Sequence, residues 1–155
     1  MILNKIESDQ IDFERLRILD FYLAHPFEIS NFRFGTLDFD RQMKSLFPRK
    51  INPYQNLRNP KKLFIRMNPY QQIAIKRLAS YGLIEIDFTN KGSVTVKDKN
   101  SLSTIIQNME INLSVSEQNA LNVACTYFFF MSYYGNNGLK SRSGLIEFKY
   151  DAQQS

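Results

Sequence analysis

The chain has 155 residues, a formal net charge of +5 and 43% hydrophobic residues. This length favours one domain, or one domain with a helical extension, and suffices to bury a core without disulfide or metal cross-links. No apolar run approaches the length of a membrane-spanning helix, and the first residues, MILNKIESDQ, lack the basic and apolar regions of a signal peptide. The composition therefore predicts a cytoplasmic protein without membrane contact, and its single cysteine agrees with a reducing compartment.

Two helices are predicted in the N-terminal part of the chain. Residues 9–24, DQIDFERLRILDFYLA, place apolar side chains at the spacing of one buried helical face, and the proline that follows ends the helix. Residues 37–47 predict a short helix that Pro48 closes. Residues 48–62 contain three prolines and several asparagines, so we expect an irregular segment there.

Residues 68–81, NPYQQIAIKRLASY, carry the clearest helix signal in the sequence. Asn68 suits the N-cap, and Pro69 suits the first helical position, where its missing N–H costs nothing. Gly82 suits the left-handed residue that ends many helices. The apolar spacing predicts that one stripe of this helix is buried, formed by Ile73, Leu78 and Tyr81, with Ile75 partly included.

A β-hairpin is predicted directly after this helix. Residues 83–86, LIEI, alternate as a strand, residues 90–92 supply the turn, and residues 93–96, SVTV, return with β-branched side chains. A helix, a glycine and a hairpin in this order are typical of the second half of a winged helix-turn-helix. The helices at 9–24 and 37–47 would supply its first two helices, with an unusually long connection to the third.

The C-terminal third is predicted to be mainly helical. Residues 101–110 favour one helix, and Ser114 with Glu117 predicts a capping box at the start of a second helix, residues 115–134. Residues 145–150, LIEFKY, predict a final strand. The last two turns of the second helix are apolar nearly all round, which fits either a central core helix or a subunit interface. The interface interpretation selects Tyr127, Phe129, Phe130, Tyr133, Tyr134, Ile146, Phe148 and Tyr150.

These elements together predict an α+β, mainly helical fold. Residues 1–100 would form a winged helix-turn-helix-like core. Residues 101–155 would form a C-terminal helical extension with a final strand, packed on that core as one compact domain. Within the extension, one face of the longer helix would be buried, namely Val115, Leu121, Ala124, Phe128 and Met131.

Positive charge is concentrated in the middle of the chain. From Arg41 to Ile84 there is no Asp or Glu, and this window holds ten of the 20 Lys and Arg residues. It predicts a basic surface for nucleic acid or an acidic protein, although a solvated loop balanced by the acidic flanks is the alternative. In a winged helix, Gln71 would also face the DNA groove. The candidate binding residues are Arg49, Lys50, Arg58, Lys61, Lys62, Arg66, Gln72, Lys76, Arg77 and the predicted wing residue Lys91.

The residue types argue against an enzyme. One Cys and one His cannot form a Cys/His zinc cluster, and the glycines match neither common phosphate-binding loop motif. His25 lies at a predicted helix end without a visible catalytic partner, and the carboxylate clusters near Asp9 and Asp38 suit helix starts. We therefore predict a non-catalytic protein with no metal site and no cofactor.

Four sequence segments resemble, in their residues and their order, the middle components of bacterial three-component ABC systems. They are RILDFYLAHPF, FPRKINPYQNLRNPKKLF, QIAIKRLASYGLIE and GLKSRSGLIEFKYD. The resemblance spans most of the chain. It implies a non-catalytic adaptor between an ABC-type ATPase and an effector component, in a system directed against phage or other invading DNA. It offers no functional residues to carry over. The functional hypotheses are thus an adaptor, with a possible homodimer through the aromatic helix, or a winged-helix DNA-binding protein, either nonspecific or regulatory.

Overall fold

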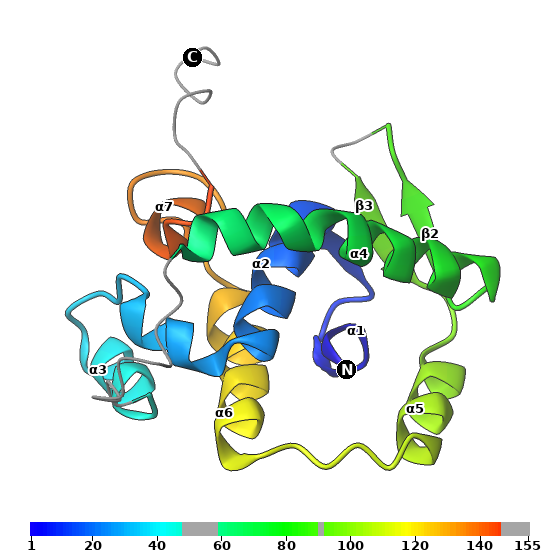
Figure 1. Cartoon of the computed structure of the whole chain (residues 1–155), viewed down its shortest axis with the longest axis horizontal. Coiled ribbons are helices and arrows are strands. Elements are labelled where there is room, and N and C mark those ends of the chain that lie inside the picture. Colours follow the sequence, from blue (N-terminus) through cyan, green and yellow to red (C-terminus); the bar gives the residue numbers. More distant parts are fainter. Residues whose placement is uncertain (48–58, 90–91, 147–155) are drawn as a thin grey trace.

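Helices and one small sheet make up the computed structural model, which describes residues 1–47, 59–89 and 92–146 (Figure 1). The fold is α+β and mainly helical, as predicted. The elements in chain order are α1 (Ile2–Lys5), β1 (Gln10–Asp12), α2 (Phe13–Ala24), the 3-10 helix η1 (Pro26–Asn31), α3 (Asp38–Ser45), α4 (Pro60–Ser80), β2 (Ile84–Asp87), β3 (Ser93–Val96), α5 (Lys99–Asn108), α6 (Val115–Val123), the π-helical segment η3 (Ala124–Phe128) and α7 (Leu139–Ser143).

The core is built around α2, whose side chains Ile18, Leu19, Phe21 and Tyr22 are almost fully buried. In Figure 1, α4 runs across the upper side of the molecule, and α2 lies between it and α6. The segment η3 and the 3-10 helix η1 also pack on α2. Because several elements pack around α2, its buried side chains are spread around the helix rather than along one stripe.

The sheet is antiparallel with the strand order β1-β3-β2. The predicted strands β2 and β3 are confirmed, whereas β1 was expected to be the first turn of a helix. Ile11 instead pairs with Val94, and its buried side chain joins the core. A strand of three residues has too little alternation to be recognised, and its partner lies more than 80 residues away in the sequence.

Helix α4 begins at Pro60, eight residues before the predicted start at Asn68. Asn59 is the true N-cap, and its side-chain oxygen accepts a hydrogen bond from the Lys62 N–H at 2.9 Å. The same Asn-Pro pattern recurs at Asn68, where the helix continues through Pro69. Pro69 is exposed, so water can hydrogen-bond to the carbonyl that lacks a helical donor. Residues 60–62 are therefore helical, and residues 48–58 lie outside the described part.

The second C-terminal helix is shorter than predicted. The capping box of Ser114 and Glu117 is present, but α6 ends at Val123 and continues as η3, where Phe129 N–H bonds to the carbonyl of Ala124 at 2.9 Å. The chain leaves the helical path after this segment, so the prediction of one helix to residue 134 was wrong. Leu145 and Ile146, expected to begin a strand, are irregular, and residues 147–150 lie outside the described residues.

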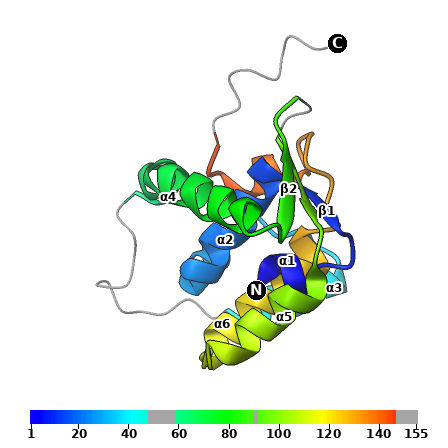
Figure 2. The ribbon, with the colours of Figure 1, turned by 90° about the vertical axis from the view of Figure 1, so that its right-hand side faces the viewer.

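Helix α4 also ends beside the hairpin, as Figure 2 shows from the side. Gly82 has φ of +73°, a left-handed conformation that lets the chain turn directly from α4 into β2.

Within the described ranges, none of the helices is both long enough and apolar enough to cross a membrane.

Candidate functional site

The buried face of α4 is fixed by three side chains, Phe64, Gln71 and Ile75. Two of the residues expected in the buried stripe, Ile73 and Tyr81, point to solvent instead, and that part of the prediction was wrong. The cause is Gln71, a polar residue in the middle of the buried face. It breaks the apolar spacing that a sequence pattern relies on, and so shifts the apparent stripe around the helix.

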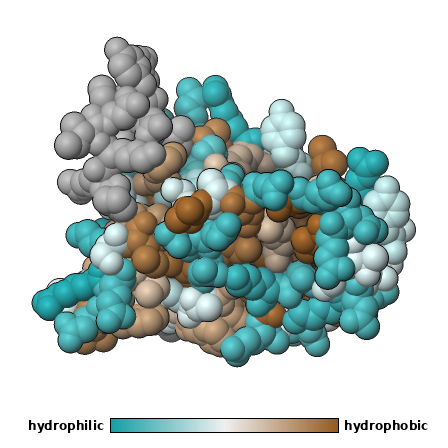
Figure 3. Space-filling view, turned by 90° about the horizontal axis from the view of Figure 1, so that it is seen from below, coloured by the Kyte–Doolittle hydropathy of each residue, from teal (hydrophilic) through white to brown (hydrophobic). Residues whose placement is uncertain are grey.

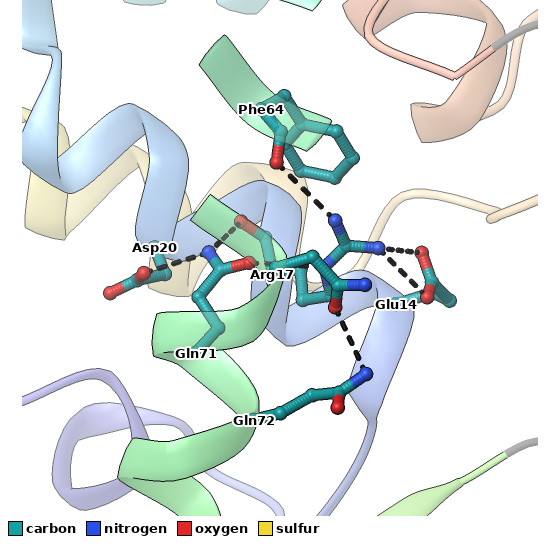
Figure 4. Close-up of polar contacts among 7 residues, drawn as sticks. Glu14, Arg17, Asp20, Phe64, Gln71 and Gln72 are labelled. Atoms are coloured by element: carbon teal, nitrogen blue, oxygen red, sulfur yellow. Dashed lines mark hydrogen bonds and ion pairs between the residues drawn. The ribbon is translucent and has the colours of Figure 1, made fainter. Parts of the chain in front are cut away.

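Gln71 is held by a buried polar network between α2 and α4 (Figure 4). Arg17 donates from Nε to the Gln71 side-chain oxygen at 3.0 Å, and the Gln71 amide donates to the Arg17 carbonyl at 3.2 Å and to Asp20 at 2.8 Å. Gln71 is 7% exposed. It therefore positions α4 and cannot reach a DNA groove, contrary to the prediction.

The Arg17 guanidinium contacts three further groups in this network. Nη1 donates to both oxygens of the Glu14 carboxylate, at 3.0 and 2.9 Å. Nη2 donates to the Phe64 carbonyl at 3.4 Å, and the guanidinium carbon lies 4.4 Å from the centre of the Phe64 ring. A planar fork of donors can serve all these acceptors at once. The rotation of α4 about its axis is set by these contacts, which decide which residues face outward.

The outward face of α4 combines large apolar side chains with basic ones. Ile65, Tyr70, Ile73 and Tyr81, which directly follows the helix, are 66%, 76%, 62% and 65% exposed. Helix α4 contains no acidic residue, and the ion pairs formed within the described ranges use none of its basic side chains. We call this surface the α4 face. Its basic residues are Lys61, Lys62, Arg66, Lys76 and Arg77, all exposed.

The structure thus brings together five of the nine predicted basic residues on one helix. Gln72 is also exposed, and its amide donates to the Asn68 side chain at 3.3 Å. Four other predicted residues, Arg49, Lys50, Arg58 and Lys91, lie outside the described residues. The apolar members of the α4 face were missed because two of them had been assigned to the core. The early Asn-Pro pair at residues 59–60 is the signal that would have placed Ile65 on this helix.

A family model, described as Middle Component 5 of ABC-three component (ABC-3C) systems, matches residues 1–151. The chain belongs to this family. The searches of curated proteins and of solved structures gave no match. Because the family match covers nearly the whole chain, α4, the sheet and the C-terminal helices of this middle component are all parts of the family unit.

The aromatic segment near residue 128 is divided between the core and the surface of this middle component. Phe128 is fully buried, and Tyr127, Phe129 and Tyr133 are partly buried. Only Phe130 and Tyr134, at 59% and 50% exposure, show large areas to solvent among the predicted interface residues that the structure describes. Ile146 is half-buried against the core, whereas Phe148 and Tyr150 lie outside the described residues. The use of this segment as an interface stays a prediction.

Arg15 holds the end of the aromatic segment in place. Its Nη1 donates to the carbonyls of Phe128, Phe129 and Met131 at 3.1, 2.8 and 2.7 Å. Carbonyls at the end of a helix have no intrahelical donor, and a guanidinium satisfies them while its charge favours the negative end of the helix dipole. Arg15 also lies over the Tyr133 ring, 5.6 Å from its centre. The direction in which Phe130 and Tyr134 emerge is therefore set from α2.

Tyr127 should make the stability of this middle component depend on pH in alkaline solution. Its hydroxyl donates to the buried carboxylate of Asp40, and burial together with this hydrogen bond raises the pKa of Tyr127 to about 12. Since the unfolded chain releases this proton at lower pH, the contribution is present below pH ~10 and is lost as the pH rises toward 12. In urea unfolding, Tyr127→Phe should show a smaller alkaline loss of stability than the wild type. Equal losses in the two proteins would contradict the assignment.

Proposed function

We propose that this middle component is a non-catalytic adaptor that bridges the ABC-type ATPase and the effector component of its system. The observation that carries the proposal is the α4 face, which exposes four large apolar side chains among basic residues on a helix without acids. A single exposed apolar residue is ordinary on a monomer, but a group of this kind on one helix is typical of a protein-binding surface.

The chemistry of the α4 face favours an acidic and partly apolar partner surface. Apolar and aromatic side chains supply the burial that stabilises a complex, and rim charges of one sign steer an oppositely charged partner and reject others. The guanidinium of Arg77 donates to the Tyr81 hydroxyl at 3.3 Å, so a basic and an aromatic member are already aligned with one another. We infer that this surface binds one of the two partners, and that Phe130 and Tyr134 contribute to the surface for the other.

The proposal predicts that apolar substitutions on α4 weaken the complex. The double variant Ile73→Ser with Tyr81→Ser should lower the affinity for one partner by at least tenfold, because it removes two of the four large apolar side chains of the surface. The measurement is copurification of the coexpressed components encoded beside this chain, followed by titration of the purified partner. Both residues are solvent-exposed, so the variant should keep the thermal stability of the wild type to within a few degrees.

A matched control is available on the opposite side of the molecule. Met109 and Val115, 64% and 74% exposed, lie near the connection between α5 and α6, far from α4 in Figure 1. Figure 3 shows that this lower side carries apolar patches separated by hydrophilic side chains. Met109→Ser with Val115→Ser removes a similar apolar area and should leave the affinity unchanged. If both double variants lower the affinity equally, or if neither lowers it, the α4 face is ruled out as the binding surface.

A DNA-binding winged helix is the second candidate function, favoured by one observation. Helices α1, α2 and α4, rather than the segments 9–24 and 37–47 first assigned, follow the chain order of a winged helix together with the strand order β1-β3-β2, and α4 then takes the position of the recognition helix. The elements η1 and α3 lie between α2 and α4 as an insertion into that order. In that case the triple variant Lys61→Ala, Lys62→Ala, Arg66→Ala should flatten the salt dependence of DNA binding by roughly one unit of slope per lost phosphate contact. The apolar double variant should then have the smaller effect.

A further inference from the structure

A polar cavity separate from the α4 face lies where the connection before α3 meets α7. It has a volume of about 480 Å³, and its walls include Arg33, Thr36, Asn136, Asn137 and Arg142. The first two residues precede α3, and the other three belong to the turn before α7 and to α7 itself. Two guanidinium groups that are 109 residues apart in the sequence therefore meet at one cavity.

Two hydrogen bonds hold the two arginines together, one between their main chains and one from the Arg142 side chain to the Arg33 main chain. The Arg33 N–H donates to the Arg142 carbonyl at 3.1 Å, and Nη1 of Arg142 donates to the Arg33 carbonyl at 3.3 Å. Nη2 of Arg33 donates to the carbonyl of Ser141 and, at 3.3 Å, to its hydroxyl. Each guanidinium is thus fixed at one nitrogen by neutral acceptors, and neither forms an ion pair with a described acidic residue.

Arg142 has a further unusual feature. Among the buried side-chain nitrogen and oxygen atoms of the described residues, its Nε is the one without a hydrogen-bond partner. Nη2 of the same guanidinium also has no acceptor within the described part of the chain. These two nitrogens form the edge with which arginine binds carboxylate and phosphate oxygens in pairs. A buried, unsatisfied donor on a charged group is costly, and a bound anion would offset that cost.

One acidic residue, Asp40, lies in the wall of the same cavity. Asp40 accepts from the Leu37 N–H at 3.0 Å through Oδ2 and from the Tyr127 hydroxyl through Oδ1. It forms no ion pair with either arginine in the described structure. Gly35 keeps this arrangement open, since a Cβ there would lie 2.2 Å from Oδ2 of Asp40 and 3.2 Å from Nη1 of Arg142.

We propose that this cavity is a binding site for a phosphate group. Two arginines from different segments line it, and the other lining residues include Thr36, Asn136 and Asn137, whose side chains carry neutral donors. A tetrahedral dianion has enough acceptor oxygens to use donors from several directions, whereas a planar carboxylate matches one guanidinium edge. The volume exceeds that of a single phosphate ion, so the ligand class is a phosphate ion or the phosphate of a small ester such as a nucleotide.

Isothermal titration calorimetry with inorganic phosphate, AMP and ATP tests the proposal on the full chain. We expect saturable binding at one site, with Arg33→Gln and Arg142→Gln each weakening the affinity by at least tenfold. Arg41→Gln is the matched control, because Arg41 is an exposed arginine of α3 that pairs with Asp38 outside the cavity wall. Equal affinities for phosphate and AMP would assign the site to the phosphate group alone, and tighter binding of AMP or ATP would assign it to a nucleotide.

The proposal is overturned if none of the three probes binds saturably, or if Arg41→Gln weakens binding as much as the cavity variants do. A second measurement covers the case in which Arg142→Gln fails to fold. In the wild-type protein, the ¹H–¹⁵N signal of the Arg142 Nε–H, assigned through its main chain, should shift on addition of phosphate and stay in place on addition of an equal concentration of chloride. An unchanged signal at saturating phosphate would exclude this guanidinium from the site.

Discussion

Replacing Phe128 by alanine is expected to lower the free energy of unfolding by about 3–5 kcal/mol, the range measured for large-to-small changes of buried aromatic residues. The Phe128 side chain is 0% exposed. Its ring centre lies 4.4 Å from that of Phe32, at the end of η1, and 5.2 Å from that of Tyr22 in α2. The Phe128 ring therefore joins η3 to both of these elements. Removing the ring would leave a cavity between three elements that cannot all move inward, so little of the loss would be recovered. Urea unfolding followed by circular dichroism measures the change.

Phe130→Ala is the matched control for this prediction. Phe130 has the same side chain and lies two residues further on, but it is 59% exposed. Its replacement should change the free energy of unfolding by no more than about 0.5 kcal/mol, as is usual for surface sites. If Phe130 belongs to a protein interface, the same variant should instead weaken partner binding. Similar losses of stability for the two variants would mean that the core does not lie where α2, η1 and η3 meet.

Local sequence signals predicted the parts of the fold that local interactions determine. Ser114 and Glu117 form their capping box within one turn, with the Ser114 N–H donating to Glu117 at 2.8 Å. Gly82 ends α4 because only glycine adopts its positive φ without strain. Only five residues separate β2 from β3 in the sequence, so the partner of each strand is close by. In these cases a few neighbouring residues contain all the information that is needed.

Two of the predictions that failed depend on contacts between distant segments, and a third failed for a local reason. Strand β1 exists because Ile11 pairs with Val94, a partner that no local pattern reveals. The start of α4 was misplaced because two Asn-Pro pairs compete as helix starts, and packing against α2 selects the earlier one. The end of α6 was misplaced because continuous apolar residues suit a π-helical segment and an α-helix equally well.

The candidate site was predictable in its charge but not in its shape. The absence of acids from the middle of the chain predicted a basic surface, and Lys62, Arg66 and Arg77 are exposed in the structure, as isolated cations usually are. The exposed apolar residues of the α4 face were hidden by the error in the buried stripe. That error traces to Gln71, whose burial depends on a partner 54 residues earlier in the chain. The cavity between Arg33 and Arg142 likewise depends on a contact over 109 residues.

Arg17→Ala is expected to destabilise the protein by about 3 kcal/mol, because it leaves buried acceptors without donors and removes the contact with the Phe64 ring. Arg17→Lys should lose most of the same stability although it keeps the charge. A lysine has one donor group, and it cannot serve Gln71, the Phe64 carbonyl and Glu14 from one position. Glu14→Gln is the control. The Glu14 side chain is 45% exposed, so its half of the ion pair should contribute no more than about 1 kcal/mol.

A double-mutant cycle separates the role of Arg17 in positioning α4 from its general role in packing. If the Arg17–Gln71 hydrogen bonds fix the rotation of α4, then Arg17→Ala and Gln71→Ala should be non-additive by roughly 1–2 kcal/mol, since either change alone already breaks the network. The sum of the two losses would then exceed that of the double variant. Additive losses would show that the two side chains act independently. The outward direction of Ile73 and Tyr81 would then have to be maintained by Phe64 and Ile75 alone.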